Sequence, residues 1–258
     1  MRQITSIEEL RGIQLDILDN IHHFCQQHKL SYFLSSGTLL GAVRHGGFIP
    51  WDDDIDIYMP RADYERFLAT YTAENYRVVS PEKDRNYYFS FAKVIDKRTK
   101  MLQEGIRGME FGVFVDIFPV DFVPEDEAER QRVFKRKHLL FKIRRCKVAK
   151  SNPLDSRLAW MFYRFLPISM AALQRCIDKL IVKTEPTSLV CNMTDGGPGI
   201  KSCFSAEAIA SSVDIDFEGH TYKTMVGFRE YLTKTYGDYM TPPPVDKRES
   251  HHFIAFWI

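Results

Sequence analysis

Hydrophobic positions along the first half of the chain change repeatedly between helical and strand-like spacing. Ser6 and Glu9 have the spacing of a capping box, and apolar residues then recur every three to four positions. This spacing predicts helices at residues 7–28, 38–45 and 60–71. Short apolar runs predict strands at residues 30–34, 54–59, 76–79, 88–95 and 111–118. The alternation of helices and strands, with a turn at 35–37, favours an α/β (α+β) fold.

The pattern changes beyond Pro124. Residues 130–150 contain ten Lys or Arg and no acid, and they follow the acidic run 125–129, an order that suits the dipole of one long helix. A second helical stretch, residues 158–183, is strongly apolar but is interrupted by Arg164 and Pro167. No linker separates the halves. We therefore expect residues 1–124 and a mainly helical lobe, residues 125–258, to pack as one compact unit.

Composition excludes several classes of protein. With 258 residues, of which 45% are hydrophobic, the chain can bury a sizeable core. A net charge of +1 gives no global attraction to nucleic acid, so no nucleic-acid partner is expected. Five scattered cysteines without a CxxC pair argue against a disulfide framework and a zinc knuckle. The sequence shows neither the apolar core of a signal peptide nor an apolar run long enough to span a membrane. The expected location is therefore cytoplasmic.

The run FIPWDDDIDIYM carries the candidate chemistry. It places four aspartates, Asp52, Asp53, Asp54 and Asp56, within five positions. In a strand, side chains alternate between faces, so Asp54 and Asp56 would project together while the flanking isoleucines enter the core. Crowded carboxylates need a cation, and oxygen ligands on a rigid strand suit Mg²⁺. Asp116 is an acid inside the apolar run FGVFVDIFPVD, so it should be buried unless it faces a site.

Three blocks of the sequence resemble the LicD family, which also includes the fukutin-related transferases. They are GTLLGAVRHGGFIPWDDDIDIYMPRADYERF, VDIFPVD and YGDYMTPPP, and together they span most of the chain. The resemblance implies a nucleotidyltransferase-like mixed sheet. It also implies transfer of a phospho-alcohol, with phosphocholine expected, from a CDP-activated donor such as CDP-choline. The implied acceptor is a hydroxyl of a cell-surface glycan or teichoic-acid precursor.

The resemblance and the residues together suggest roles in the site. Mg²⁺ or Mn²⁺ is the expected cofactor, because divalent ions neutralise a diphosphate in phosphoryl-type transfer. The predicted metal ligands are Asp52, Asp54, Asp56 and Asp116. The predicted catalytic residues are Asp54, Asp56 and Asp116. The predicted substrate-binding residues are Gly37, Thr38, Arg44, Lys93 and Trp51.

Each substrate-binding residue has its own physical reason. Free backbone amides at Gly37 and Thr38, at a helix start, favour a phosphate. Arg44 offers a planar fork to the donor diphosphate, and Lys93 is a second cation on a predicted strand. Trp51 is either a core anchor or part of an aromatic wall for a quaternary ammonium group.

Several interpretations stay open at this point. Strand alternation points Asp53 away from Asp54 and Asp56, and whether Asp53 is a capping residue stays open. His251 and His252 follow the PPP stretch with no assigned role. The reaction could instead be nucleotidyl transfer from an NTP. A catalytically inactive module that binds nucleotide or metal is a third reading.

The basic run 130–150 and the apolar stretch 158–173 suggest a further hypothesis. Cations favour an anionic bilayer surface, and an apolar stretch too short to span can lie in the interface. The helical pair would then attach the protein peripherally to the inner membrane face, where a lipid-linked glycan acceptor is presented. The alternative is a packed helical pair with a solvated basic face.

Overall fold

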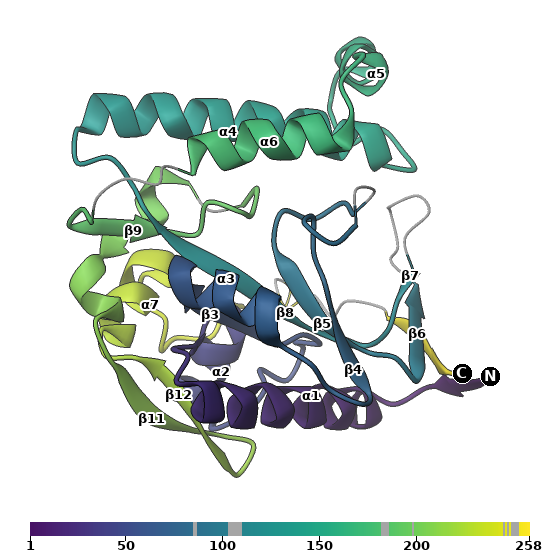
Figure 1. The fold of residues 1–258 in the computed structure, drawn as a ribbon, viewed down its shortest axis with the longest axis vertical. Coiled ribbons are helices and arrows are strands. Elements are labelled where there is room, and N and C mark those ends of the chain that lie inside the picture. Colours follow the sequence, from purple (N-terminus) through teal and green to yellow (C-terminus); the bar gives the residue numbers. More distant parts are fainter. Residues whose placement is uncertain are drawn as a thin grey trace.

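A mixed β-sheet with helices packed around it forms the centre of the molecule, so the predicted α/β fold class is confirmed (Figure 1). The computed structural model describes residues 1–84, 87–102, 110–181, 186–197, 199–244, 246, 248 and 253–258. In these residues the main sheet has seven strands, ordered β10-β9-β8-β3-β2, with β5 also on β8 and β4 on β5. The strands are β2 (Phe33–Leu34), β3 (Asp56–Pro60), β4 (Tyr76–Val79), β5 (Ala92–Asp96), β8 (Phe114–Phe122), β9 (Leu189–Cys191) and β10 (Phe204–Ser205).

Strand β8 is the central strand of this sheet. It pairs in parallel with β3 and antiparallel with β5 and β9. Its residues from Phe114 to Asp121 are all buried, because the chain packs against both faces of the strand. Since β9 comes from beyond residue 124, the main sheet takes strands from both halves of the chain.

The described part of the chain contains seven α-helices, of which α4, α5 and α6 form the upper layer in Figure 1. They are α1 (Ile7–His28), α2 (Ser36–His45), α3 (Arg61–Thr70), α4 (Glu127–Val148), α5 (Arg157–Phe165), α6 (Met170–Leu180) and α7 (Phe228–Tyr236). The first three pack on the sheet. Helices α4 and α6 lie side by side at the top of Figure 1, and α5 projects beyond the C-terminal end of α4.

Two smaller sheets complete the fold. One joins the chain termini in the order β1-β13-β6-β7, and the other is a hairpin of β11 and β12. The strands are β1 (Arg2–Ile4), β6 (Thr99–Leu102), β7 (Glu110–Phe111), β11 (Ser212–Phe217), β12 (His220–Met225) and β13 (Ile254–Trp257). The sequence patterns did not predict the hairpin, in which exposed and partly buried positions alternate along β11 around few strongly apolar residues.

Most predicted elements are confirmed, and their boundaries shift where tertiary contacts decide them. The helix at 7–28 is confirmed, with the Ser6 hydroxyl accepting from the Glu9 amide at 3.1 Å. The predicted turn at 35–37 is wrong, because α2 already begins at Ser36. The predicted strand at 54–59 begins only at Asp56, where pairing with β8 starts. The stretch 158–183 divides into α5 and α6 around Pro167.

Helix α2 lies unusually close to the loop that precedes β3. A methyl group added at Gly41 would come closer than 3.0 Å to the carbonyl oxygen of Gly47, and within 3.2 Å of the amide of Ile49. Only a residue without a side chain lets the helix and this backbone approach so closely. The glycine therefore sets the position of the segment that leads into the aspartates.

In the part of the chain that the structure describes, no helix is both long enough and apolar enough to cross a membrane.

We predict that Gly41→Ala destabilises the protein by about 1–3 kcal/mol, because its methyl group overlaps backbone that cannot rotate away. The matched control is Gly12→Ala in α1, where an added methyl group meets nothing within 4 Å. That change should hold or raise stability, since alanine favours a helix by about 0.5–1 kcal/mol over glycine. Chemical denaturation measures both. Equal effects of the two substitutions would contradict the close approach.

Candidate active site

The loop that carries Asp52, Asp53 and Asp54 is held by helix α1. The Arg11 guanidinium donates to the carbonyl oxygens of Ile49 at 2.9 Å and Asp52 at 2.6 Å. The Gln14 side chain, which is fully buried, donates to the carbonyl of Asp53 at 2.8 Å. These bonds fix the loop through its backbone carbonyl groups and do not involve the aspartate side chains. Arg11 and Gln14 are positioning residues that the sequence patterns did not single out.

Helix α2 supports the same acids from another side. The Thr38 hydroxyl accepts from the backbone amide of Asp56 at 2.8 Å. A side chain at Gly37 would meet the Asp52 carboxylate, with a methyl group only 2.5 Å from Oδ2. Gly37 and Thr38 are thus in direct contact with the aspartate cluster. Their proposed contact with a substrate phosphate stays a prediction.

Asp56 and Asp116 face each other across the parallel pair β3 and β8, where they are register partners. On the other edge of β8, Lys93 is the register partner of Asp116, and its Nζ lies 2.5 Å from Oδ1 of that carboxylate. Both side chains are buried. The ammonium group also lies over the rings of Phe114 at 3.5 Å and Phe89 at 4.5 Å. Lys93 is therefore an internal counter-ion of Asp116.

Burial and mutual repulsion raise the pKa values of these carboxyl groups. Desolvation is the largest cause for Asp52, whose pKa rises to about 7, with the charges of Asp54 and Asp53 adding to it. Burial also raises the pKa of Asp56 well above its usual range. The pKa of Asp116 rises to about 6, because desolvation outweighs the opposing effect of Lys93. The folded protein therefore concentrates negative charge at a cost that a bound cation would offset.

The geometry supports a divalent cation at the loop. Asp52, Asp53 and Asp54 can each offer a carboxylate oxygen, and these three oxygens lie within 4.8 Å of one another. Strand alternation had suggested that Asp53 points away from Asp54. That expectation is wrong, because the strand begins only at Asp56 and alternation does not apply before it. Hard carboxylate oxygens are ligands that fit Mg²⁺ or Mn²⁺.

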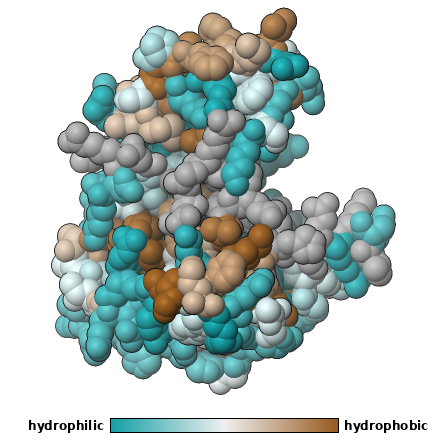
Figure 2. All heavy atoms as spheres, turned by 90° about the vertical axis from the view of Figure 1, so that its right-hand side faces the viewer, coloured by the Kyte–Doolittle hydropathy of each residue, from teal (hydrophilic) through white to brown (hydrophobic). Residues whose placement is uncertain are grey.

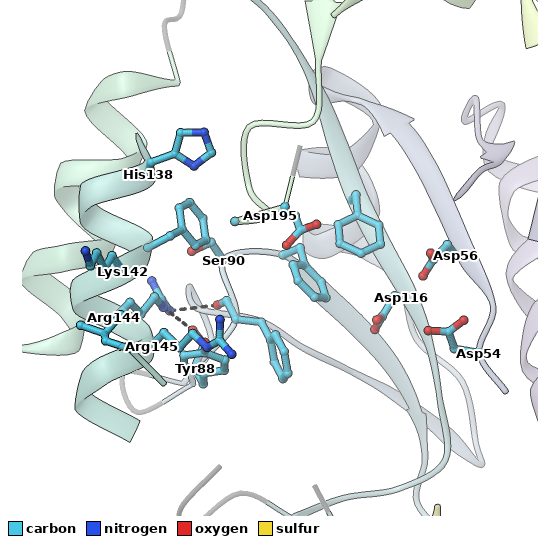
Figure 3. A pocket seen from close by; sticks show the side chains of 17 residues that line it. Asp54, Asp56, Tyr88, Ser90, Asp116, His138, Lys142, Arg144, Arg145 and Asp195 are labelled. Carbon is cyan, nitrogen blue, oxygen red and sulfur yellow. Dashed lines mark hydrogen bonds between the residues drawn. The ribbon is translucent and has the colours of Figure 1, made fainter. Parts of the chain in front are cut away.

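A cavity of about 610 Å³ lies between the sheet and helix α4 (Figure 3). Its acidic side carries four carboxylates, those of Asp54, Asp56, Asp116 and Asp195. Its opposite side is formed by α4 and carries His138, Lys142, Arg144 and Arg145. Aromatic side chains line the space as well, namely Tyr88, Phe89, Phe91, Phe118 and Phe141. The cavity thus joins three of the predicted acids to a cationic and an aromatic surface.

Arg144 has a structural task within this wall. It is buried, and its guanidinium donates to the carbonyl oxygens of Tyr87 and Phe89, each at 3.0 Å, and to the Gln174 side chain at 2.6 Å. It also donates to the carbonyl of Tyr88. The expectation of a uniformly solvated basic face over residues 130–150 is therefore wrong at Arg144, which fixes the aromatic segment to α4.

All five predicted substrate-binding residues, including Gly37 and Thr38, lie outside the cavity lining. Arg44 donates from Nη1 to the carbonyl of Tyr239 at 3.0 Å. Trp51 is partly buried against the core, with the Arg248 guanidinium 4.9 Å from its ring centre. Lys93 reaches the site only through Asp116. His251 and His252 lie outside the described residues.

The structure also brings in residues that sequence reasoning missed. Asp195 enters the cavity from the glycine-rich run TDGGPGIK, where an isolated acid gives no signal of its own. Ser90 lines the cavity, is buried, and its hydroxyl has no hydrogen-bond partner within the described residues. A buried unpaired hydroxyl is unusual unless a ligand or water completes it. Only the folded chain reveals either residue as part of the site.

Comparison with known proteins gives consistent matches. Residues 29–158 match the family described as LicD/FKTN/FKRP, nucleotidyltransferase domain. The chain is 35% identical to the lipopolysaccharide cholinephosphotransferase LicD of Haemophilus influenzae, over an alignment of 272 positions that covers 100% of both chains. It is also 36% identical, over 143 positions, to an uncharacterized protein of Rickettsia typhi, with 50% of this chain and 41% of that protein covered. The chain therefore belongs to the LicD family.

Proposed function

We propose that this protein transfers phosphocholine from CDP-choline to a hydroxyl group of a cell-surface glycan, and that Mg²⁺ or Mn²⁺ is its cofactor. One observation carries the proposal. A single cavity joins a cluster of carboxylates to an aromatic wall and a row of cations. The full-length similarity to a lipopolysaccharide cholinephosphotransferase supports both the choline moiety and the glycan.

The carboxylates suit the diphosphate end of the donor. Asp54 would hold the divalent cation, because it belongs to the carboxylate group of the loop and also lines the cavity beside Asp56 and Asp116. When bound, such an ion would neutralise the negative charge of the diphosphate. Without the cation, the negatively charged aspartates would repel the diphosphate of the donor. We therefore expect the transfer reaction to depend on the metal.

The aromatic wall suits the choline end. The ring centres of Phe91 and Phe118 lie 4.1 Å apart, those of Phe89 and Phe91 5.0 Å, and those of Tyr88 and Phe89 4.9 Å. Aromatic faces attract a quaternary ammonium group, which cannot donate hydrogen bonds. The Asp195 carboxylate lines the same space and complements a positive charge. This surface replaces Trp51 as our candidate for the choline site.

The transfer itself needs an acceptor oxygen, a leaving group and a place for one proton. The acceptor hydroxyl oxygen attacks the phosphorus of the phosphocholine group, and the bond from that phosphorus to the CMP oxygen breaks. CMP leaves, and the hydroxyl proton passes to Asp116. A pKa near 6 makes this carboxylate a better base than an ordinary aspartate at neutral pH. Lys93 acts as a positioning residue that holds the Asp116 side chain.

We predict that Asp54→Asn or Asp56→Asn abolishes CMP release from CDP-choline while the fold persists. Removing one charge relieves repulsion on the neighbouring acids, so without metal the melting temperature should hold or rise. The assay measures CMP formed in the presence of Mg²⁺ and a lipopolysaccharide acceptor. The matched control is Asp216→Asn, an exposed acid on β11, which should keep wild-type turnover.

The same assay separates the competing functions. Near wild-type turnover of either site variant in saturating Mg²⁺ would contradict the metal assignment. Consumption of an NTP in place of CDP-choline would favour nucleotidyl transfer. Binding of CDP-choline without any turnover would favour an inactive module.

A further prediction concerns pH. In the folded protein the pKa values of Asp52 and Asp116 lie at about 7 and 6, above the roughly 3.9 of an unfolded aspartate. Between these values the folded state binds more protons than the unfolded state. Stability in the presence of a chelator should therefore increase as the pH falls through 7 and 6, and this gain is lost as the pH rises again.

Scanning calorimetry measures this dependence with EDTA and with Mg²⁺. Because protons compete with the metal, added Mg²⁺ should raise the melting temperature more at high pH than at low pH. Asp52→Asn should reduce the pH dependence in EDTA. A Mg²⁺ effect that is the same at every pH would argue against binding at these carboxylates.

A further inference from the structure

Helix α5 turns an apolar face outward. Leu158, Met161, Phe162 and Phe165 are 81%, 44%, 64% and 72% exposed. Their spacing places them on one stripe of the helix. In Figure 1, α5 projects beyond the rest of the helical layer, and apolar atoms gather at the top of the face shown in Figure 2. Contiguous exposed apolar side chains of this size mark an interaction surface.

The opposite side of α5 is fixed to α4, so the outward direction of the stripe is set by the fold. Arg164 donates to the carbonyl of Ala149 at 3.1 Å, and Lys147 donates to the carbonyl of Leu166 at 2.7 Å. The Lys142 ammonium lies 5.5 Å from the ring centre of Tyr163. Through these contacts the polar groups of α4 and α5 bind the neighbouring helix. The apolar stripe of α5 is left facing solvent.

Exposed cations lie on the segments next to α5. Lys150 lies in the segment between α4 and α5, Arg157 is the first residue of α5, and Arg145 lies on α4, against which α5 packs. Between residues 130 and 165 the sequence contains one acid, Asp155. A bilayer with acidic headgroups has an apolar interior beneath an anionic surface. An apolar stripe with neighbouring cations complements both of these layers.

A second copy of the chain fits this surface poorly. In a symmetric dimer the same patch meets itself, so the cationic borders would face each other. Exposed side chains of this size offer roughly 150–250 Å² each when fully exposed, so the stripe supplies on the order of 500 Å². A stable interface needs about 800 Å² per partner.

We propose that α5 docks on the surface of an anionic lipid bilayer, with its apolar stripe at the headgroup boundary and the flanking cations on acidic headgroups. The helix lies in the interface and does not cross it. Lys142, Arg145 and Leu154 also line the cavity, so the docked face adjoins the candidate active site. The docking does not rest on the proposed transfer reaction, and it can be tested without any assay of turnover.

Co-sedimentation with lipid vesicles tests the docking. The full chain should sediment with vesicles that contain phosphatidylglycerol, should bind pure phosphatidylcholine at least about tenfold more weakly, and should detach in high salt. Leu158→Ser combined with Phe165→Ser should lower the partition coefficient by about tenfold or more. Lys150→Gln combined with Arg157→Gln should lower it by on the order of tenfold.

The matched control variants replace the same types of residue at exposed positions outside α5. Met240→Ser with Val226→Ser removes exposed apolar side chains away from α5, and Arg132→Gln with Lys135→Gln removes two exposed charges at the other end of α4. Both controls should keep wild-type binding. The proposal is overturned if the protein does not sediment, if the controls lose as much as the α5 variants, or if sedimentation velocity shows a dimer that the Leu158 and Phe165 changes dissociate.

Discussion

Mutual repulsion among carboxylates at the start of β3 is the constraint on which the rest of the structure depends. Burial raises the pKa values of Asp52 and Asp56, and the neighbouring charge of Asp54 raises both further. The chain holds them together through backbone bonds from Arg11 and from neighbouring helices, and these bonds do not involve the aspartate side chains. Such an arrangement is unfavourable by itself, and it favours any cation that enters.

The helical layer encloses the charged surface of the sheet in a cavity. Without α4 the acids on the internal strands β3 and β8 would face solvent. With α4 in place they face cations and aromatic rings across a bounded space. The buried Arg144 maintains that geometry, because its guanidinium ties the segment around Tyr88 to α4 and α6. A ligand with separate anionic and cationic groups matches such a lining better than one of a single charge.

The sequence predicts those parts of the site that depend on local periodicity. Alternation within a strand grouped Asp54 with Asp56, and the family resemblance placed Asp116 on a neighbouring strand, where β3 and β8 pair it with Asp56. The same rule failed for Asp53, because no local pattern shows that the strand begins two residues after Asp54. The sequence could not predict Asp195 or the role of Arg144, for another reason. Both depend on how distant segments pack, which neither composition nor spacing encodes.

The central claim is that the aspartate cavity holds a divalent cation beside the donor. Anomalous diffraction from crystals grown with Mn²⁺ and CDP-choline tests it most directly. We predict a manganese peak within about 2.2 Å of an Asp54 carboxylate oxygen, inside the cavity, with the trimethylammonium group against the rings around Phe89. A cavity without a manganese peak, or a donor bound away from these aspartates, would contradict the account.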